Sequence, residues 1–176
     1  MDLVEKILIL HQTLTVAQLP HAFGGALALA WCTERARGTI DIDVNIFIPA
    51  KDFEIALTAL PQDIKISKQD RAALKGDGQV RLWWEKTPVD IFLNNTLFHE
   101  SIAKRIRWEK FSGKTVPFLS CQDLAVFKAF FNRTKDWADL EEMHNAGTLD
   151  VPKVRVVLID HLGAEDERIA RLNKFI

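Results

Sequence analysis

The chain has 176 residues, of which 48% are hydrophobic and 27% are charged. This composition is ordinary for a globular protein with one domain, or with a core domain and a small appendage, and argues against a disordered or membrane-spanning chain. The formal net charge of −1 excludes a strongly basic nucleic-acid-binding protein, so any contact with nucleic acid would need a local patch.

The start of the chain, MDLVEKILILHQTL, predicts an amphipathic helix from about Leu3 to Thr15 with Asp2 as its cap. It has acidic residues at its front and lacks the basic front and small-residue cleavage site of a signal peptide. No apolar run reaches the roughly 18 residues that a membrane-spanning helix needs. We therefore expect a cytoplasmic protein without a membrane partner.

A strand, a glycine turn and a helix come next, because the extended QLPHAF precedes Gly24 and Gly25 and the helix formers of ALALAWCTERA. TIDIDVNIF then alternates apolar and polar residues, which predicts a strand over residues 40–48. Asp41 and Asp43 lie on its polar face, roughly 6 to 7 Å apart, and repel each other unless a positive charge lies between them.

The two cysteines, Cys32 and Cys121, lie far apart and form no C-x-x-C pair. This spacing argues against a disulfide framework and against a zinc ribbon. We expect both to be small residues of the core.

After a helix over AKDFEIALTAL, the segments QVRLWWE and PVDIFLNN predict a hairpin whose turn is KT. Its second strand carries a third aspartate, Asp90. Trp83 and Trp84 point to opposite faces of the first strand. One of them could offer a stacking surface for a base, but we expect both in the core.

From TLFHESIAKRI onward helices predominate, with an extended insert around RWEKFSGKTVPFL. Ser120 and Asp150 are predicted to begin two of these helices. The pattern predicts an α/β (α+β) fold with a mixed β-sheet core and flanking helices over residues 1–100. A helical C-terminal bundle is expected over residues 101–176.

Three carboxylates carry the functional prediction. If the strand of Asp90 lies beside that of Asp41 and Asp43, the three side chains converge in an all-oxygen ligand set that suits Mg²⁺ or Mn²⁺ rather than zinc. Gly24 and Gly25 leave bare backbone N–H groups at the start of a helix, where a phosphate can bind. These features predict a site for a metal-bound nucleoside triphosphate.

Each part also has a purely structural explanation. A glycine pair before a helix is often a tight turn, and an Asp-x-Asp on a strand is often a solvated edge face. A lone histidine such as His21, beside the glycine turn, is usually structural. The ordered combination of GG, RGTIDIDV and VDIF is much more specific than any of its parts.

In this order the motifs, over about residues 20 to 95, resemble the nucleotidyltransferase superfamily with the DNA polymerase β-like fold. Within it, the chain resembles the small bacterial AbiEii-like and minimal nucleotidyltransferases. The resemblance implies Mg²⁺ or Mn²⁺ and a nucleoside triphosphate as ligands. It implies catalytic, metal-binding carboxylates at Asp41, Asp43 and Asp90, and nucleotide contacts at Gly24, Gly25, Arg37 and Thr39. Thr39 could instead brace the loop before the first aspartate.

A second block, DLAVFKAFFNRTKDWADLEEM, resembles the helical segment that follows the catalytic domain in AbiEii-like members. The resemblance implies that Lys128 or Lys135 meets the triphosphate, and that Asp136 or Asp139 orients a lysine or the nucleotide. The alternative is a solvated helix start with acidic residues in its first turn and Arg133 nearby.

The resemblance implies transfer of a nucleoside monophosphate to a hydroxyl acceptor, which could be an RNA end, a protein or a small molecule. By analogy it also implies a toxin–antitoxin or defence role, with a cognate antitoxin or a homo-oligomer as partner. Two alternatives stay open. One is a catalytically silent nucleotide- or partner-binding module of this fold, and the other is an α/β interaction domain whose aspartates do not converge.

Overall fold

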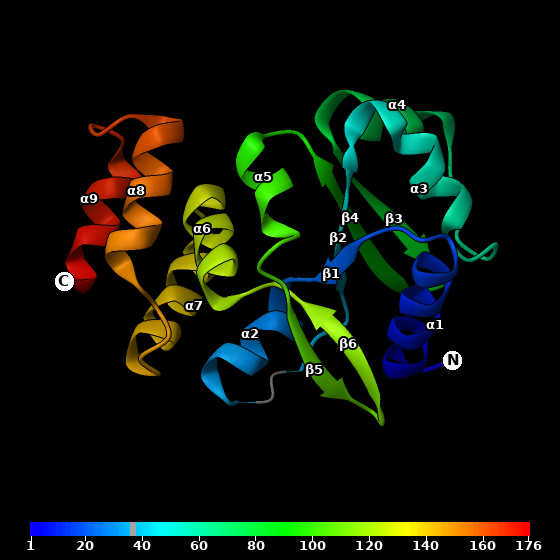
Figure 1. Ribbon diagram of the computed structural model, residues 1–176, viewed down its shortest axis with the longest axis horizontal. Coiled ribbons are helices and arrows are strands. Elements are labelled where there is room, and N and C mark those ends of the chain that lie inside the picture. The colour runs from blue at the N-terminus through cyan, green and yellow to red at the C-terminus, as the bar shows by residue number, and fades with distance from the viewer. Residues whose placement is uncertain (36–37) are drawn as a thin grey trace. The chain divides into compact units, whose positions relative to one another are not determined.

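The computed structural model describes residues 1–35 and 38–176, which form two compact units (Figure 1). The first unit comprises residues 1–27 and 38–119, and the second contains the stretch that starts at Ala28 and the helices from Ser120 onward. The predicted α/β fold with a mixed sheet is confirmed.

The helices of the described residues are α1 (Leu3–Val16), α2 (Gly25–Thr33), η1 (Ala50–Asp52), α3 (Phe53–Ala59), α4 (Lys68–Asp77), α5 (Leu97–Ile102), α6 (Cys121–Phe131), α7 (Thr134–Asn145), α8 (Val151–Leu162), α9 (Glu167–Leu172) and η2 (Asn173–Phe175). The strands are β1 (His21–Phe23), β2 (Ile42–Pro49), β3 (Gln79–Trp84), β4 (Thr87–Asn94), β5 (Arg107–Phe111) and β6 (Lys114–Phe118). Within residues 1–35 and 38–176, no helix has the length and apolar character to cross a bilayer.

In the part of the chain that the structure describes, six strands form one sheet in the order β3-β4-β2-β1-β6-β5. The pairs β1/β6 and β2/β4 are parallel and the other neighbours are antiparallel. The predicted extended insert supplies β5 and β6, which continue the sheet beyond β1. The first unit therefore reaches Leu119, whereas the sequence places the boundary near residue 100.

The helix α1 begins as predicted at the cap Asp2, which forms a capping box with Glu5. Its residues Ile7, Leu10 and Leu14 are fully buried at helical spacing. In the first unit, α1, α3 and α4 lie on one side of the sheet (Figure 1). The face of the sheet that these helices cover is apolar. The opposite face of β2, β4 and β3 is therefore available for polar side chains.

The hairpin turn differs from the prediction by one residue. Glu85 and Lys86 form the turn, with Glu85 at φ +56°, so that Trp84 pairs with Thr87. The buried Lys6 fixes this turn, because its Nζ donates to the carbonyl of Trp84 and to Thr87 Oγ1 and pairs with the Glu85 carboxylate. When a two-residue turn shifts by one position along the chain, each residue of the first strand faces a partner two positions away from the predicted one.

The two tryptophans of β3 have different surroundings. Trp84 lies in the core, as expected, but Trp83 is 53% exposed, so its predicted place in the core is wrong. The alternation of a strand decides this, because neighbouring residues point to opposite faces and only one face of β3 is covered.

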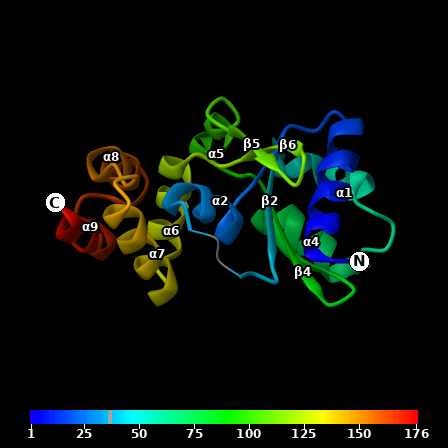
Figure 2. The same ribbon diagram turned by 90° about the horizontal axis from the view of Figure 1, so that it is seen from below.

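In the second unit, α6 and α8 begin as predicted, with Ser120 and Asp150 as their caps. The helices α8 and α9 lie side by side (Figure 2). Cys32 and Cys121 form a disulfide with Cα atoms 5.5 Å apart, so the prediction of two unpaired core cysteines is wrong. A separation of 89 residues carries no sign of this contact, since only tertiary packing brings the two helices together.

Candidate functional site

The glycine turn holds the second aspartate of the predicted site. Gly24 N donates to the carbonyl of Asp43 at 2.9 Å, which extends the β1–β2 pairing into the turn. A Cβ at Gly25 would lie 1.9 Å from Asp43 Oδ2, and Gly25 has a φ of +52°. Space and backbone conformation therefore both require glycine at this position. The Asp43 carboxylate lies against the N-terminal, positive end of α2.

The third aspartate lies beside the second. Asp43 and Asp90 are register partners on the parallel strands β2 and β4, which lie about 4.8 Å apart. Their side chains point to the same face of the sheet. The predicted adjacency of the two strands is confirmed.

Arg81 on β3 joins the site, and the sequence reasoning missed it. Its Nε and Nη2 donate to the two Asp90 oxygens at 2.8 and 2.6 Å, and Nη2 also reaches Asp41 Oδ2 at 3.4 Å. The hydrogen bond to Asp90 is the largest cause that raises the pKa of the Arg81 guanidinium. The negative charges of Asp90, Asp41 and Asp43 raise it further. The correct turn, with Trp84 opposite Thr87, would have placed Arg81 opposite Asp90.

The three aspartates therefore converge, and the site stays open to solvent. The side chains of Arg81, Asp41 and Asp90 are 51%, 32% and 17% exposed. An accidental motif match, in which the aspartates lie apart, is inconsistent with this geometry.

The loop before β2 braces Asp41. Thr39 Oγ1 accepts from the Asp41 N–H at 3.2 Å and donates to the Asp41 carbonyl at 3.3 Å. Ile40, predicted to lie on the apolar face of the strand, is 73% exposed because β2 begins only at Ile42. The predicted phosphate contact Arg37 lies outside the described residues.

The donor set matches a hard divalent cation, since Asp41, Asp43 and Asp90 present only carboxylate oxygens. Among the described residues, no group of three or more His, Cys, Asp or Glu side chains is positioned to hold a metal ion as it stands. The guanidinium of Arg81 contacts two of the three carboxylates instead. A cation bound by Asp90 would therefore compete with Arg81 for the same oxygens.

Two residues further along β2, on the same face as Asp43, the Asn45 side chain lies beside a buried histidine. His99 Nε2 lies 3.0 Å from Asn45 Oδ1, within hydrogen-bond distance. Burial lowers the pKa of His99 to about 4, which keeps the ring neutral at physiological pH. The sequence shows no sign of this pair.

His21 lies at the other end of β1, opposite Ile46, and is structural as expected. Its Nδ1 donates to the carbonyl of Leu19 at 2.8 Å, so its Nε2 accepts from His11 Nδ1 at 2.9 Å. Burial lowers the pKa of His21 to about 4.

The second predicted block forms a buried ion network in the second unit. Lys128 Nζ lies 2.6 Å from Asp139 and 4.0 Å from Asp136, and Arg133 Nε lies 2.7 Å from Asp136. Lys128, Asp136 and Asp139 are each less than a tenth exposed, whereas Lys135 is exposed. Contact of these residues with a nucleotide stays a prediction.

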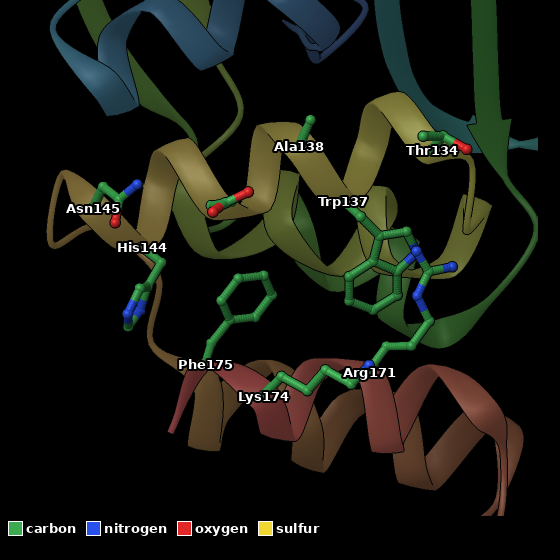
Figure 3. Close-up of a pocket in the computed structure, with 9 residues that line it drawn as sticks. Thr134, Trp137, Ala138, His144, Asn145, Arg171, Lys174 and Phe175 are labelled. Atoms are coloured by element: carbon green, nitrogen blue, oxygen red, sulfur yellow. The ribbon is translucent and has the colours of Figure 1, made fainter.

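The second unit also contains a hollow of about 610 Å³ between α7 and the C-terminal helices (Figure 3). Phe175 stacks on Trp137 with ring centroids 6.5 Å apart, and the Arg171 guanidinium lies 4.3 Å from the Trp137 ring centre. Arg171 also donates to Asn132 Oδ1. Of the residues predicted to bind nucleotide, none that the structure describes lines this hollow.

No protein-family model matches the sequence, and no curated protein is significantly similar to it. Solved structures share its fold. The solution structure of the antibiotic-resistance factor ANT(2″)-Ia is 15% identical with a TM-score of 0.63, over 97% of this chain and 95% of that chain. A crystal structure of ANT(2″)-Ia in complex with adenylyl-2″-tobramycin is 14% identical with a TM-score of 0.58, over 99% and 97% of the two chains.

An antigenic nucleotidyltransferase-like protein from Paracoccidioides brasiliensis is 15% identical with a TM-score of 0.52, over 98% of this chain and 92% of that chain. Identities this low establish the fold alone. The chain has the fold of these nucleotidyltransferases, as predicted, while the narrower likeness to AbiEii-like proteins stays a prediction.

Proposed function

We propose that the protein is a nucleotidyltransferase that moves a nucleoside monophosphate from a nucleoside triphosphate to a hydroxyl acceptor. The observation that carries this proposal is the convergence of Asp41, Asp43 and Asp90 on one open face, beside a glycine turn that begins a helix. The fold shared with nucleotidyltransferases supports it.

In the proposed site the triphosphate binds at Gly24 and Gly25. The backbone N–H groups at the start of α2 and the positive end of that helix attract its negative charge. The absence of a Cβ at Gly25 leaves the room that the Asp43 carboxylate occupies at this helix end. The Asp43 carboxylate already lies at this helix end, so a cation is needed where phosphate and carboxylate meet.

We propose Mg²⁺ as that cation, with Mn²⁺ as a substitute and Asp41, Asp43 and Asp90 as the ligands. When bound, it would polarise the phosphoryl oxygens and offset the charge of the departing pyrophosphate. Asp90 accepts the proton of the acceptor hydroxyl at a carboxylate oxygen. The acceptor oxygen then bonds to the α-phosphorus as its bond to pyrophosphate breaks.

A second candidate function rests on Arg81. Its guanidinium offsets the charge of Asp90 and Asp41, which gives a stable site without a metal ion. A catalytically silent module that binds a nucleotide or a protein partner would need no more than this. If the resemblance to AbiEii-like toxins extends to function, that partner is a cognate antitoxin.

A label-transfer experiment separates the two. Purified protein is incubated with Mg²⁺, each of the four α-labelled nucleoside triphosphates, and cellular RNA, protein or small-molecule extract. We expect label in one fraction, lost in an Asp41→Asn, Asp43→Asn double variant and retained in Asp63→Asn, which alters an exposed aspartate of the same unit. Nucleotide binding without transfer in any fraction would favour the silent module.

A further inference from the structure

The strand β5 forms one edge of the sheet (Figure 1). It pairs with β6 on one side, and no residue that the structure describes pairs with its outer side. At the opposite edge, by contrast, Lys65 forms an isolated bridge to Trp83 on β3. An uncovered edge presents main-chain donors and acceptors to which another strand can bind, so the sheet can be extended at β5.

The pairing with β6 decides which main-chain groups of β5 point outward. Leu119 N donates to the Phe23 carbonyl on β1, and the direction of these groups alternates along a strand, so the main chain of Pro117 also points toward β1. Trp108 lies opposite Pro117 and therefore belongs to a pair without hydrogen bonds. The N–H and C=O groups of Trp108 point to the open edge, and those of Lys110 do the same.

The charges of β5 favour one way of pairing with a second copy of itself. Two antiparallel copies are related by a two-fold axis, at which one residue faces its own counterpart. An axis at Arg107, Glu109 or Lys110 places two like charges directly opposite each other, which is destabilising. An axis at Phe111 pairs only the end of the strand. With the axis at Trp108, Arg107 faces Glu109 of the second copy, and symmetry forms this contact twice.

The main chain agrees with the same register. Because the N–H and C=O groups of Trp108 point outward, two facing copies of this residue can exchange both hydrogen bonds. Arg107 and Glu109 then form the pairs without hydrogen bonds, in which Cα atoms lie about 4.5 Å apart and side chains are closest. Within one chain Arg107 Nη2 lies 2.6 Å from Glu109 Oε1, so the four charges alternate in sign around the axis.

We propose that β5 is a dimerisation edge whose partner is a second copy of this chain, paired antiparallel about Trp108. Arg107 and Glu109 set the register, and the outward main-chain groups join the two sheets. The acidic site around Arg81 lies on β2, β4 and β3, toward the opposite edge, so this dimer leaves the site open. The inference does not depend on the proposed function, because it involves neither the nucleotide nor the acceptor.

Charge reversal tests the proposal through the mass of the protein in solution. Sedimentation velocity is measured over a range of concentrations for the unaltered protein, for Arg107→Glu, for Glu109→Arg, and for an equimolar mixture of these two variants. The controls are Arg71→Glu and Glu54→Arg, because these residues form an exposed pair of the same types elsewhere in the first unit. Circular dichroism verifies that each variant is folded.

We expect the unaltered protein to be a dimer and each reversal to weaken dimerisation by about tenfold or more, because two opposite-charge contacts become like-charge contacts. The mixture should recover the dimer, since Arg107→Glu presents two glutamates on β5 and Glu109→Arg presents two arginines. An ion pair within one chain cannot produce this recovery. In the unaltered protein, hydrogen exchange at the Trp108 amide, measured by NMR, should slow as the concentration rises.

Three results would overturn the proposal. A monomer at every concentration would exclude the dimer, and a dimer that both reversals leave intact would exclude β5 as its interface. A mixture that stays monomeric would exclude the register centred on Trp108. Equal weakening in the Arg71→Glu and Glu54→Arg controls would have the same consequence as an intact dimer, because it would remove the specific role of β5.

Discussion

The acidic site of the first unit and the ion network of the second contain the same kinds of side chain in opposite surroundings. Around Arg81, the carboxylates of Asp41 and Asp90 are open to solvent and share one guanidinium. Around Lys128, the carboxylate of Asp139 is almost fully buried and pairs at 2.6 Å. Both groups belong to motifs that resemble nucleotidyltransferases.

Burial decides what each cluster can do. An exposed pair contributes little to stability, because water screens it, and its carboxylates can exchange the arginine for another cation. A buried pair cannot exchange partners without leaving a charge unpaired in a medium of low polarity. We infer that the carboxylates around Arg81 can exchange partners, and that the buried pair of Lys128 and Asp139 holds α6 and α7 together.

The largest expected loss of stability comes from breaking the buried pair. Lys128→Met removes the buried cation that pairs with Asp139 and should lower the free energy of unfolding by roughly 3–5 kcal/mol. Urea denaturation measures this change. The control Lys153→Met removes an exposed pair with Asp150 in the same unit and should leave the midpoint unchanged. If both variants unfold alike, the network does not stabilise the second unit.

Lowering the pH should destabilise the first unit, because it protonates His21 and His99 on unfolding. Their pKa values in the folded protein are about 4, below the ordinary 6.5, so the unfolded chain binds more protons between these values. Their contribution is fully present above pH 6.5 and is lost as the pH falls toward 4, by about 3 kcal/mol for each ring. His99→Gln should flatten the decline of the unfolding free energy over this range, and an unchanged decline would contradict burial of a neutral ring.

Reduction of the disulfide should destabilise the second unit. The Cys32–Cys121 disulfide closes a loop across 89 positions, and its loss is expected to cost about 2–4 kcal/mol. A Cys32→Ser, Cys121→Ser double variant should match the reduced protein in urea and should no longer respond to dithiothreitol. Alkylation of the denatured, unreduced protein provides an independent check, since two modified thiols would show that the bond is absent.

The smallest stability effect is expected at the acidic site itself. Asp90→Asn should change the free energy of unfolding by less than about 1 kcal/mol, because its partner Arg81 is half exposed. The same variant should lower nucleotidyl transfer by about a hundredfold or more, because the general base is lost. A large loss of stability with unchanged transfer would show that Asp90 stabilises the fold and does not take part in catalysis, which contradicts this prediction.

Sequence reasoning placed Asp43 and Asp90 on strands and Gly24 and Gly25 before a helix, as the structure has them, because strands and turns leave local patterns. It misplaced the hairpin turn by one residue and so missed Arg81, whose role depends on register across strands. The second block was interpreted from its resemblance, and its burial could not be inferred from charged residues that also suit a solvated helix.

By itself the sequence indicated most of the helices and strands, the caps Asp2, Ser120 and Asp150, and the glycine and aspartate motifs, because these depend on neighbours a few positions apart. Tertiary structure alone decided that Arg81 joins the carboxylates, that Trp83 is exposed while Trp84 is buried, and that Cys32 bonds to Cys121. These outcomes depend on contacts between residues distant in sequence, on strand register, and on which sheet face the helices cover.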